Sequence, residues 1–99
     1  MRASLDVLGT KWALLVVRDL LDQPCRFGEL LESVSGISAK VLTDRLRELE
    51  AAGVVQREVY VGTPVRSGYS LTEHGKALRP VIEALSFWGV GLRAQRQSA

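Results

Sequence analysis

The sequence has 99 residues, of which 46% are hydrophobic and 24% charged, as in one ordinary globular domain with no room for a separate catalytic module. Its net charge of +2 identifies no nucleic-acid partner, so the placement of the 13 basic residues matters more. The single cysteine excludes an internal disulfide framework and a multi-cysteine zinc site. No stretch approaches the ~20 apolar residues that span a membrane, and no signal sequence is recognisable. We therefore expect a cytoplasmic protein without metal or cofactor.

The first part of the chain is predicted to form two helices. Residues 5–21 carry apolar side chains at helical spacing, interrupted just before Thr10. Thr10 can cap a new helix, so we expect a short helix followed by a longer one. The longer helix has only two polar residues between positions 12 and 21, which indicates burial on most sides, and Pro24 ends it.

Two further helices joined by a tight turn follow. Residues 26–33 predict a short helix, and the pair at 35–36 (Ser-Gly) predicts the turn. The helix with the clearest boundary signals covers residues 39–52. Ser38 is a favourable N-cap for it, and Gly53 supplies the left-handed residue that ends it.

A β-hairpin and a last helix complete the pattern. Residues 54–61 are rich in β-branched side chains and predict the first strand. Residues 62–64 predict the turn, and residues 67–71 predict the second strand. Thr72 can cap a helix that continues to about residue 92, with a kink or break at Pro80. This order predicts a winged helix-turn-helix, a mainly α single domain with a small β-hairpin. We assign the helix-turn-helix to about residues 26–53, the wing to about 54–71 and a C-terminal dimerisation helix to about 72–93.

The helix over residues 39–52 has two different faces. Its apolar leucines form one face, and the other carries short or cationic side chains that let the backbone approach a second surface. Lys and Arg favour guanine acceptors, and Ala39 and Thr43 suit thymine methyl groups. Asp44 has two possible roles, accepting from a cytosine amino group or holding Lys40 one turn away. Taken alone, this face fits DNA contact and an ordinary solvated helix equally well.

The neighbouring elements favour DNA contact. Arg66 stands where a wing would touch the minor groove or backbone, and Arg26 stands at the start of the preceding helix, near the expected phosphates. The candidate DNA-binding residues are Arg26, Ser38, Ala39, Lys40, Thr43, Asp44, Arg47 and Arg66.

The last helix carries a stripe typical of helix pairing. Leu78, Leu85 and Leu92 repeat every seven residues, and Val81 and Trp88 fill the positions between them. The stripe continues for more turns than one small core needs, which favours contact between chains over contact within one chain. The first helix is expected beside it. The predicted dimer interface comprises Leu5, Leu8, Trp12, Leu78, Val81, Leu85, Trp88 and Leu92.

Five blocks in order resemble the HxlR family of regulators over nearly the whole chain. They are LDVLGTKW at 5–12, RFGEL at 26–30, GISAKVLT with LRELE within 36–50, YSLTEHG at 69–75, and the closing Trp88-Gly89. The resemblance implies a homodimeric repressor or activator in a bacterial cytoplasm. It implies that the recognition helix and wing contact double-stranded DNA, and that the first and last helices form the dimer interface. An unknown small-molecule effector is a further possible partner.

The sequence allows three other interpretations of its function. A winged helix used only for protein–protein contact would more often carry large apolar residues on its outer face. A redox- or electrophile-sensing regulator could use Cys25, because the adjacent Arg26 could lower its pKa, although an inert structural thiol is favoured. Many family members carry a sensing cysteine before the first helix, and this sequence starts at Met1 without it. An enzyme using Cys25 and His74 lacks a third orienting residue, so we expect no enzyme.

Overall fold

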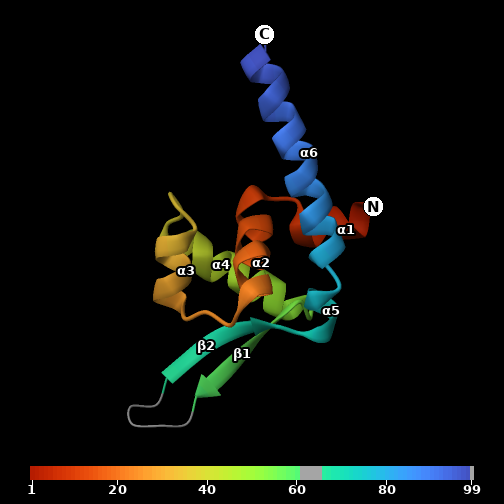
Figure 1. The fold of residues 1–99 in the computed structure, drawn as a ribbon. Coiled ribbons are helices and arrows are strands. Elements are labelled where there is room, and N and C mark those ends of the chain that lie inside the picture. Colours follow the sequence, from red (N-terminus) through yellow and green to blue (C-terminus); the bar gives the residue numbers. More distant parts are fainter. Residues whose placement is uncertain (61–65, 99) are drawn as a thin grey trace.

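The helices surround a central α2, and the hairpin and the last helix leave the body at opposite ends (Figure 1). The computed structural model describes residues 1–60 and 66–98. Its elements are α1 Arg2–Leu8, α2 Lys11–Asp22, α3 Phe27–Ser33, α4 Ala39–Ala51, β1 Val55–Tyr60, β2 Arg66–Leu71, α5 Glu73–Lys76 and α6 Arg79–Ser98. This is the predicted mainly α winged helix-turn-helix with one two-stranded antiparallel hairpin.

The core forms where α2 and α4 meet. Helix α2 is exposed only at Lys11, Arg18 and Asp22, which confirms that it is buried on most sides. Helix α4 contributes three leucines with at most 1% exposure, and burying each stabilises the fold by about 1.5–3 kcal/mol. They are Leu42, Leu46 and Leu49. The inner face of α4 is therefore fixed, and its outer face is available for binding.

The predicted helix ends are confirmed by their capping bonds. The Thr10 hydroxyl accepts a hydrogen bond from the Ala13 amide at 3.2 Å, and the Ser38 hydroxyl accepts one from the Val41 amide at 3.1 Å. Gly53 has φ +76°, as predicted, although α4 ends at Ala51, one residue early. Such caps stabilise a helix by about 1 kcal/mol each.

The hairpin is anchored by a contact that the sequence did not predict. Its strands pair from Val55 opposite Leu71 to Tyr60 opposite Arg66, and the predicted turn at residues 62–64 lies outside the described residues. The Cys25 amide donates to the Tyr69 carbonyl at 2.9 Å, and the Tyr69 amide donates back to the Cys25 carbonyl at 2.8 Å. These two bonds tie the wing to the segment between α2 and α3.

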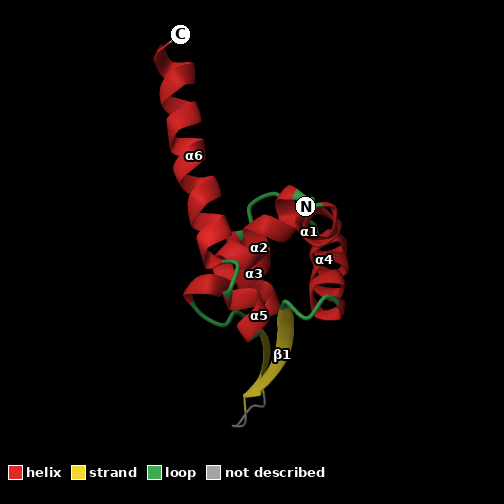
Figure 2. Cartoon of the chain, turned by 90° about the vertical axis from the view of Figure 1, so that its right-hand side faces the viewer, coloured by secondary structure: helices red, strands yellow, loops and turns green. Residues whose placement is uncertain are grey.

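The C-terminal region breaks where proline predicted it. Thr72 caps α5, and α6 then begins at Arg79, so Pro80 lies in the first turn, where its missing N–H needs no partner. Helix α6 continues to Ser98, six residues beyond the predicted end at Leu92, and projects away from the body (Figure 2). Among the described residues, no helix is long and apolar enough to cross a membrane.

Candidate nucleic-acid interface

The outer face of α4 carries small and cationic side chains. Ala39, Lys40 and Arg47 are exposed, while the leucines on the other side are buried. The Thr43 hydroxyl donates to the Ala39 carbonyl at 2.8 Å, and the Ser38 hydroxyl is engaged in the cap. Because the helix itself uses both hydroxyl groups, the longer side chains are the ones best suited to reach an acceptor on DNA.

The two cations of this face differ in their surroundings. Lys40 Nζ lies 3.1 Å from Asp44 Oδ2, one helical turn away, which favours the second of the two roles considered for Asp44. The lysine side chain is 86% exposed, and an exposed pair of this kind contributes only about 0.2–1 kcal/mol, so a phosphate can replace the carboxylate. Arg47 forms no ion pair within residues 1–60 and 66–98, so its guanidinium is available to an external acceptor.

The two flanking arginines lie on different elements. Arg26 is the N-cap of α3, where its amide donates to Glu29 Oε1 at 2.8 Å and its Nε lies 3.6 Å from the same oxygen. Arg66 is the first residue of β2, opposite Tyr60, and its side chain lies outside the part of the chain described.

A third arginine, not among the predicted contacts, connects the wing to α4. Arg57 on β1 pairs with Glu50 of α4 at 3.1 Å and lies 5.7 Å from the centre of the Tyr69 ring. The strand assignment places Arg57 on the wing, but only the fold brings it beside Glu50. This pair helps to fix the orientation of the wing relative to α4.

Cys25 corrects one sequence-based expectation. Its half-buried thiol donates to the Gln23 carbonyl at 3.4 Å. Burial, followed by the negative charges of Glu29, Asp19 and Asp22, raises the pKa of the Cys25 thiol. Arg26 does not lower this pKa as expected, because the thiol is partly buried and nearby carboxylates outnumber that cation, one of which pairs with it.

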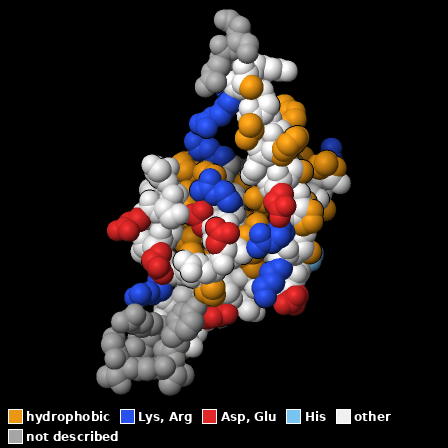
Figure 3. Space-filling view, viewed as in Figure 1, with side chains coloured by type: hydrophobic (Ala, Val, Ile, Leu, Met, Phe, Trp, Pro, Cys, Tyr) orange, Lys and Arg blue, Asp and Glu red, His pale blue; other side chains and the backbone are white. Residues whose placement is uncertain are grey.

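The stripe on α6 is largely uncovered within one chain. Val81 is 44%, Leu85 48% and Trp88 66% exposed, whereas Leu78 and Leu92 are half-buried. The α6 residue that does enter the core is Ile82, which is 7% exposed and lies off the stripe. In Figure 3 hydrophobic side chains gather along the projecting helix and beside its base.

The three residues of the predicted interface that lie near the N-terminus differ in exposure. Leu5 is 57% exposed, but Leu8 and Trp12 are half-buried against the core of their own chain. The Lys11 ammonium lies 4.4 Å from the centre of the Trp12 ring. Trp12 therefore already packs within its own chain.

Comparison of the sequence with known proteins identifies its family. The model of the HxlR-like helix-turn-helix family matches residues 7–97. The chain belongs to this family. A curated relative, the uncharacterised HTH-type transcriptional regulator YvaP of Bacillus subtilis, is 45% identical over 86% of this chain and 79% of its own length. The HTH-type transcriptional regulator YodB of the same organism is 41% identical over 89% of this chain and 79% of its own length.

Solved structures of two similar regulators share the fold. The reduced form of YodB has a TM-score of 0.81 at 41% identity and covers 89% of this chain and 86% of its own. The redox regulator HypR in its reduced form has a TM-score of 0.87 at 39% identity, and the match covers 99% of this chain and 97% of the HypR chain. This HxlR-like protein is thus a DNA-binding transcriptional regulator, and its relatives are regulators rather than enzymes.

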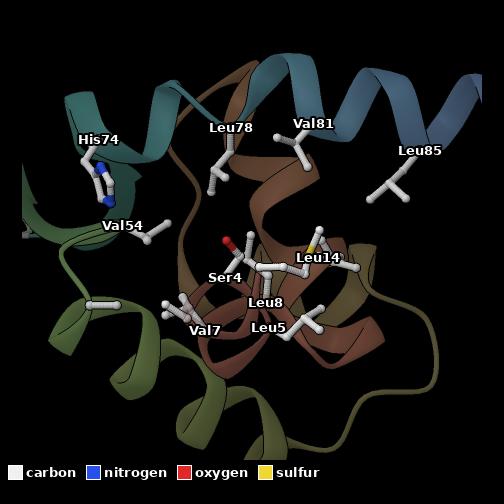
Figure 4. Close-up of a pocket in the computed structure, with 13 residues that line it drawn as sticks. Ser4, Leu5, Val7, Leu8, Leu14, Val54, His74, Leu78, Val81 and Leu85 are labelled. Carbon is white, nitrogen blue, oxygen red and sulfur yellow. The ribbon is translucent and has the colours of Figure 1, made fainter.

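An apolar groove of about 700 Å³, not predicted from the sequence, runs between α1 and α6 of this HxlR-like chain. In Figure 4, Val81 and Leu85 of α6 and the preceding Leu78 point into it from one side, and Leu5 and Leu8 of α1 from the other. One end reaches Val54, beside the junction between α4 and the wing, and His74 on α5. The groove therefore extends from the predicted dimer helices to the base of the DNA-binding elements.

Proposed function

We propose that this regulator binds an inverted-repeat operator as a homodimer in the cytoplasm, with α4 in the major groove and the wing beside it. The observation that carries the proposal is the exposed face of α4, where small residues accompany Lys40 and an Arg47 that has no ion pair in the described part of the chain. Such a helix can approach base edges closely, and Arg is the side chain that most often reads guanine.

The site residues have distinct proposed roles. Arg47 reads a base edge, and Lys40 exchanges its pair with Asp44 for a phosphate or a guanine. Ala39 and Thr43 are small enough to let the helix backbone approach the bases. Ser38 contributes by capping the helix. Arg26 at the start of α3 and Arg66 at the start of β2 contact phosphates on either side. Asp44 positions Lys40.

The homodimer is proposed from the terminal helices. Val81, Leu85 and Trp88 present a continuous apolar stripe to solvent, and Leu5 of α1 is exposed as well. Contiguous exposed apolar surface of this kind marks an interaction site in a soluble protein. Two chains related by a two-fold axis would present two copies of α4 to half-sites about 34 Å apart, or a multiple of that spacing.

Selection of bound fragments from random DNA, followed by footprinting, tests this proposal. We expect an inverted repeat protected by two chains. A footprint over one unrepeated half-site, with one chain bound, contradicts the dimeric mode. If the winged helix serves only protein–protein contact, no fragment is enriched and no salt-dependent DNA binding is measured.

A redox-sensing role has support only from the names of relatives. HypR is described as a redox regulator, and solved structures of YodB include a quinone-bound form. In this chain the raised pKa of Cys25 disfavours the reactive thiolate at neutral pH, so we propose a structural thiol.

A further inference from the structure

Arg47 of α4 stands near two carboxylates on its own helix. Side chains three or four residues apart are neighbours on a helix surface, so Asp44 and Glu50 are both within reach of Arg47. Such a spacing does give an ion pair on this helix, because Arg45 Nη2 lies 3.0 Å from Glu48 Oε1, three residues later. In the described part of the chain, Arg47 nevertheless pairs with neither of its acidic neighbours.

Both of these carboxylates already have a cationic partner. Asp44 Oδ2 lies 3.1 Å from Lys40 Nζ, and Glu50 Oε1 lies 3.1 Å from Arg57 Nε of β1. A carboxylate paired in this way attracts a second cation only weakly, because the first cation largely cancels its charge. Lys40 and Arg57 therefore leave the guanidinium of Arg47 free for an acceptor outside the chain.

The two pairs differ in the element that supplies the cation. Lys40 lies on α4, so it gives up Asp44 only when α4, Arg47 included, is already at the DNA. Arg57 lies on the wing, so Glu50 is held only while β1 rests against α4. The availability of Arg47 therefore depends on where the wing lies.

The position of Arg57 is fixed by the contacts that anchor the wing. Tyr69 stands opposite Arg57 in the hairpin, and the centre of its ring lies 5.7 Å from the guanidinium carbon. The Tyr69 backbone makes two hydrogen bonds to Cys25, before α3. The wing is thus tied to the body on one side and to Glu50 on the other.

We propose that Arg57 is a positioning residue for base recognition, which holds Glu50 and so keeps Arg47 free to reach the operator. When the wing moves away from α4, Glu50 is released and pairs with Arg47, three residues before it. Base reading by α4 is thereby coupled to the position of the wing. This inference rests on the proposed function, in which Arg47 reads a base edge.

The affinity ratio between operator and random DNA, measured by fluorescence anisotropy, tests the proposal. Changes in general charge act on both DNAs alike and cancel in this ratio, whereas loss of a base contact lowers it. Arg57→Ala releases Glu50. Because an exposed ion pair is weak, we expect the ratio to fall by about 1.5- to 5-fold.

A second substitution shows whether the released carboxylate causes this loss. Glu50→Gln keeps the size of the side chain and removes its charge, so alone it should leave the ratio unchanged. Combined with Arg57→Ala, it should restore the wild-type ratio. Lys76→Ala is the matched control, since it also removes a cation and releases a carboxylate, that of Glu73 on α5. It should leave the ratio unchanged.

Two other roles of Arg57 predict different results, and either result overturns the proposal. If Arg57 only contacts a phosphate, Arg57→Ala weakens binding to both DNAs equally, with a salt slope smaller by about one. If the pair acts only by orienting the wing, Glu50→Gln alone lowers the ratio as much as Arg57→Ala, and the double variant does not recover.

NMR of the protein without DNA separates this inference from the proposed function. The Nε–Hε signal of Arg47 should shift in Arg57→Ala and return to its wild-type position when Glu50→Gln is added. A signal that does not shift shows that Glu50 does not capture Arg47, and it overturns the inference alone. A signal that shifts as expected, while Arg47→Ala leaves the affinity ratio unchanged, supports the capture and refutes base reading by Arg47.

Discussion

Gly75→Ala probes the contact on which the wing junction depends. A Cβ atom at Gly75 would lie 2.2 Å from the Val54 carbonyl oxygen, 3.1 Å from its carbon and 3.2 Å from Leu71 Cβ. The same carbonyl accepts from the Thr72 amide at 3.0 Å, so it cannot turn away without losing that bond. Helix α5 must therefore shift away from Val54.

The expected loss of stability follows from this clash. Overpacking of a well-packed site lowers stability by about 1–3 kcal/mol, whereas the higher helix propensity of alanine raises it by about 0.5–1 kcal/mol. In a domain of this size each kcal/mol changes Tm by about 4–8 °C. Thermal unfolding should show a lower Tm, and it is measured at one fixed protein concentration because the proposed dimerisation would make Tm concentration-dependent.

Gly28→Ala is the matched control. Gly28 is also helical, and a Cβ atom there meets nothing within 4 Å, so we expect an unchanged or higher Tm. The reasoning is refuted if Gly75→Ala is as stable as the wild type while Gly28→Ala behaves as expected.

Four further predictions have defined outcomes. Ser38→Ala removes the cap of α4 and should lower the free energy of unfolding by about 1 kcal/mol in urea titrations, and an unchanged midpoint would show that the cap contributes nothing. Leu85→Asp should sediment as a monomer and lose operator binding, so a dimer that still binds would exclude Leu85 from the interface. Because its pKa is raised, Cys25 should react with iodoacetamide more slowly than a free thiol at pH 7 and accelerate only at higher pH; a fast reaction at pH 7 would contradict the raised pKa. Peroxide treatment should leave DNA binding intact, and a loss that disappears in Cys25→Ser would establish a redox role.

Features encoded over a few residues were predictable from the sequence. Thr10 and Ser38 cap their helices because a side-chain oxygen meets an amide three residues later, and Gly53 ends α4 because glycine tolerates positive φ. The two faces of α4 follow from helical periodicity alone. For the same local reason, Pro80 predicted the break between α5 and α6.

Features that join distant segments were not predictable. The bridge between Cys25 and Tyr69 and the approach of Gly75 to Val54 depend on how α2, the hairpin and α5 come together. The pKa of Cys25 was misjudged because the sequence does not show that the thiol is partly buried, nor that Glu29, Asp19 and Asp22 all come close enough to outweigh the adjacent Arg26. The groove exists only because α1 and α6, which are far apart in the sequence, line the same space.

Binding of Arg47→Ala to the selected operator is the most direct test of the proposed function. Fluorescence anisotropy would compare wild type, Arg47→Ala and the control Arg93→Ala, which removes the same charge from the projecting α6. We predict that Arg47→Ala weakens operator binding by about 1–3 kcal/mol while Arg93→Ala does not. A uniform loss on operator and random DNA, with a salt slope smaller by about one, would reassign Arg47 to a phosphate. Unchanged affinity of Arg47→Ala for both DNAs would contradict the placement of α4 in the major groove.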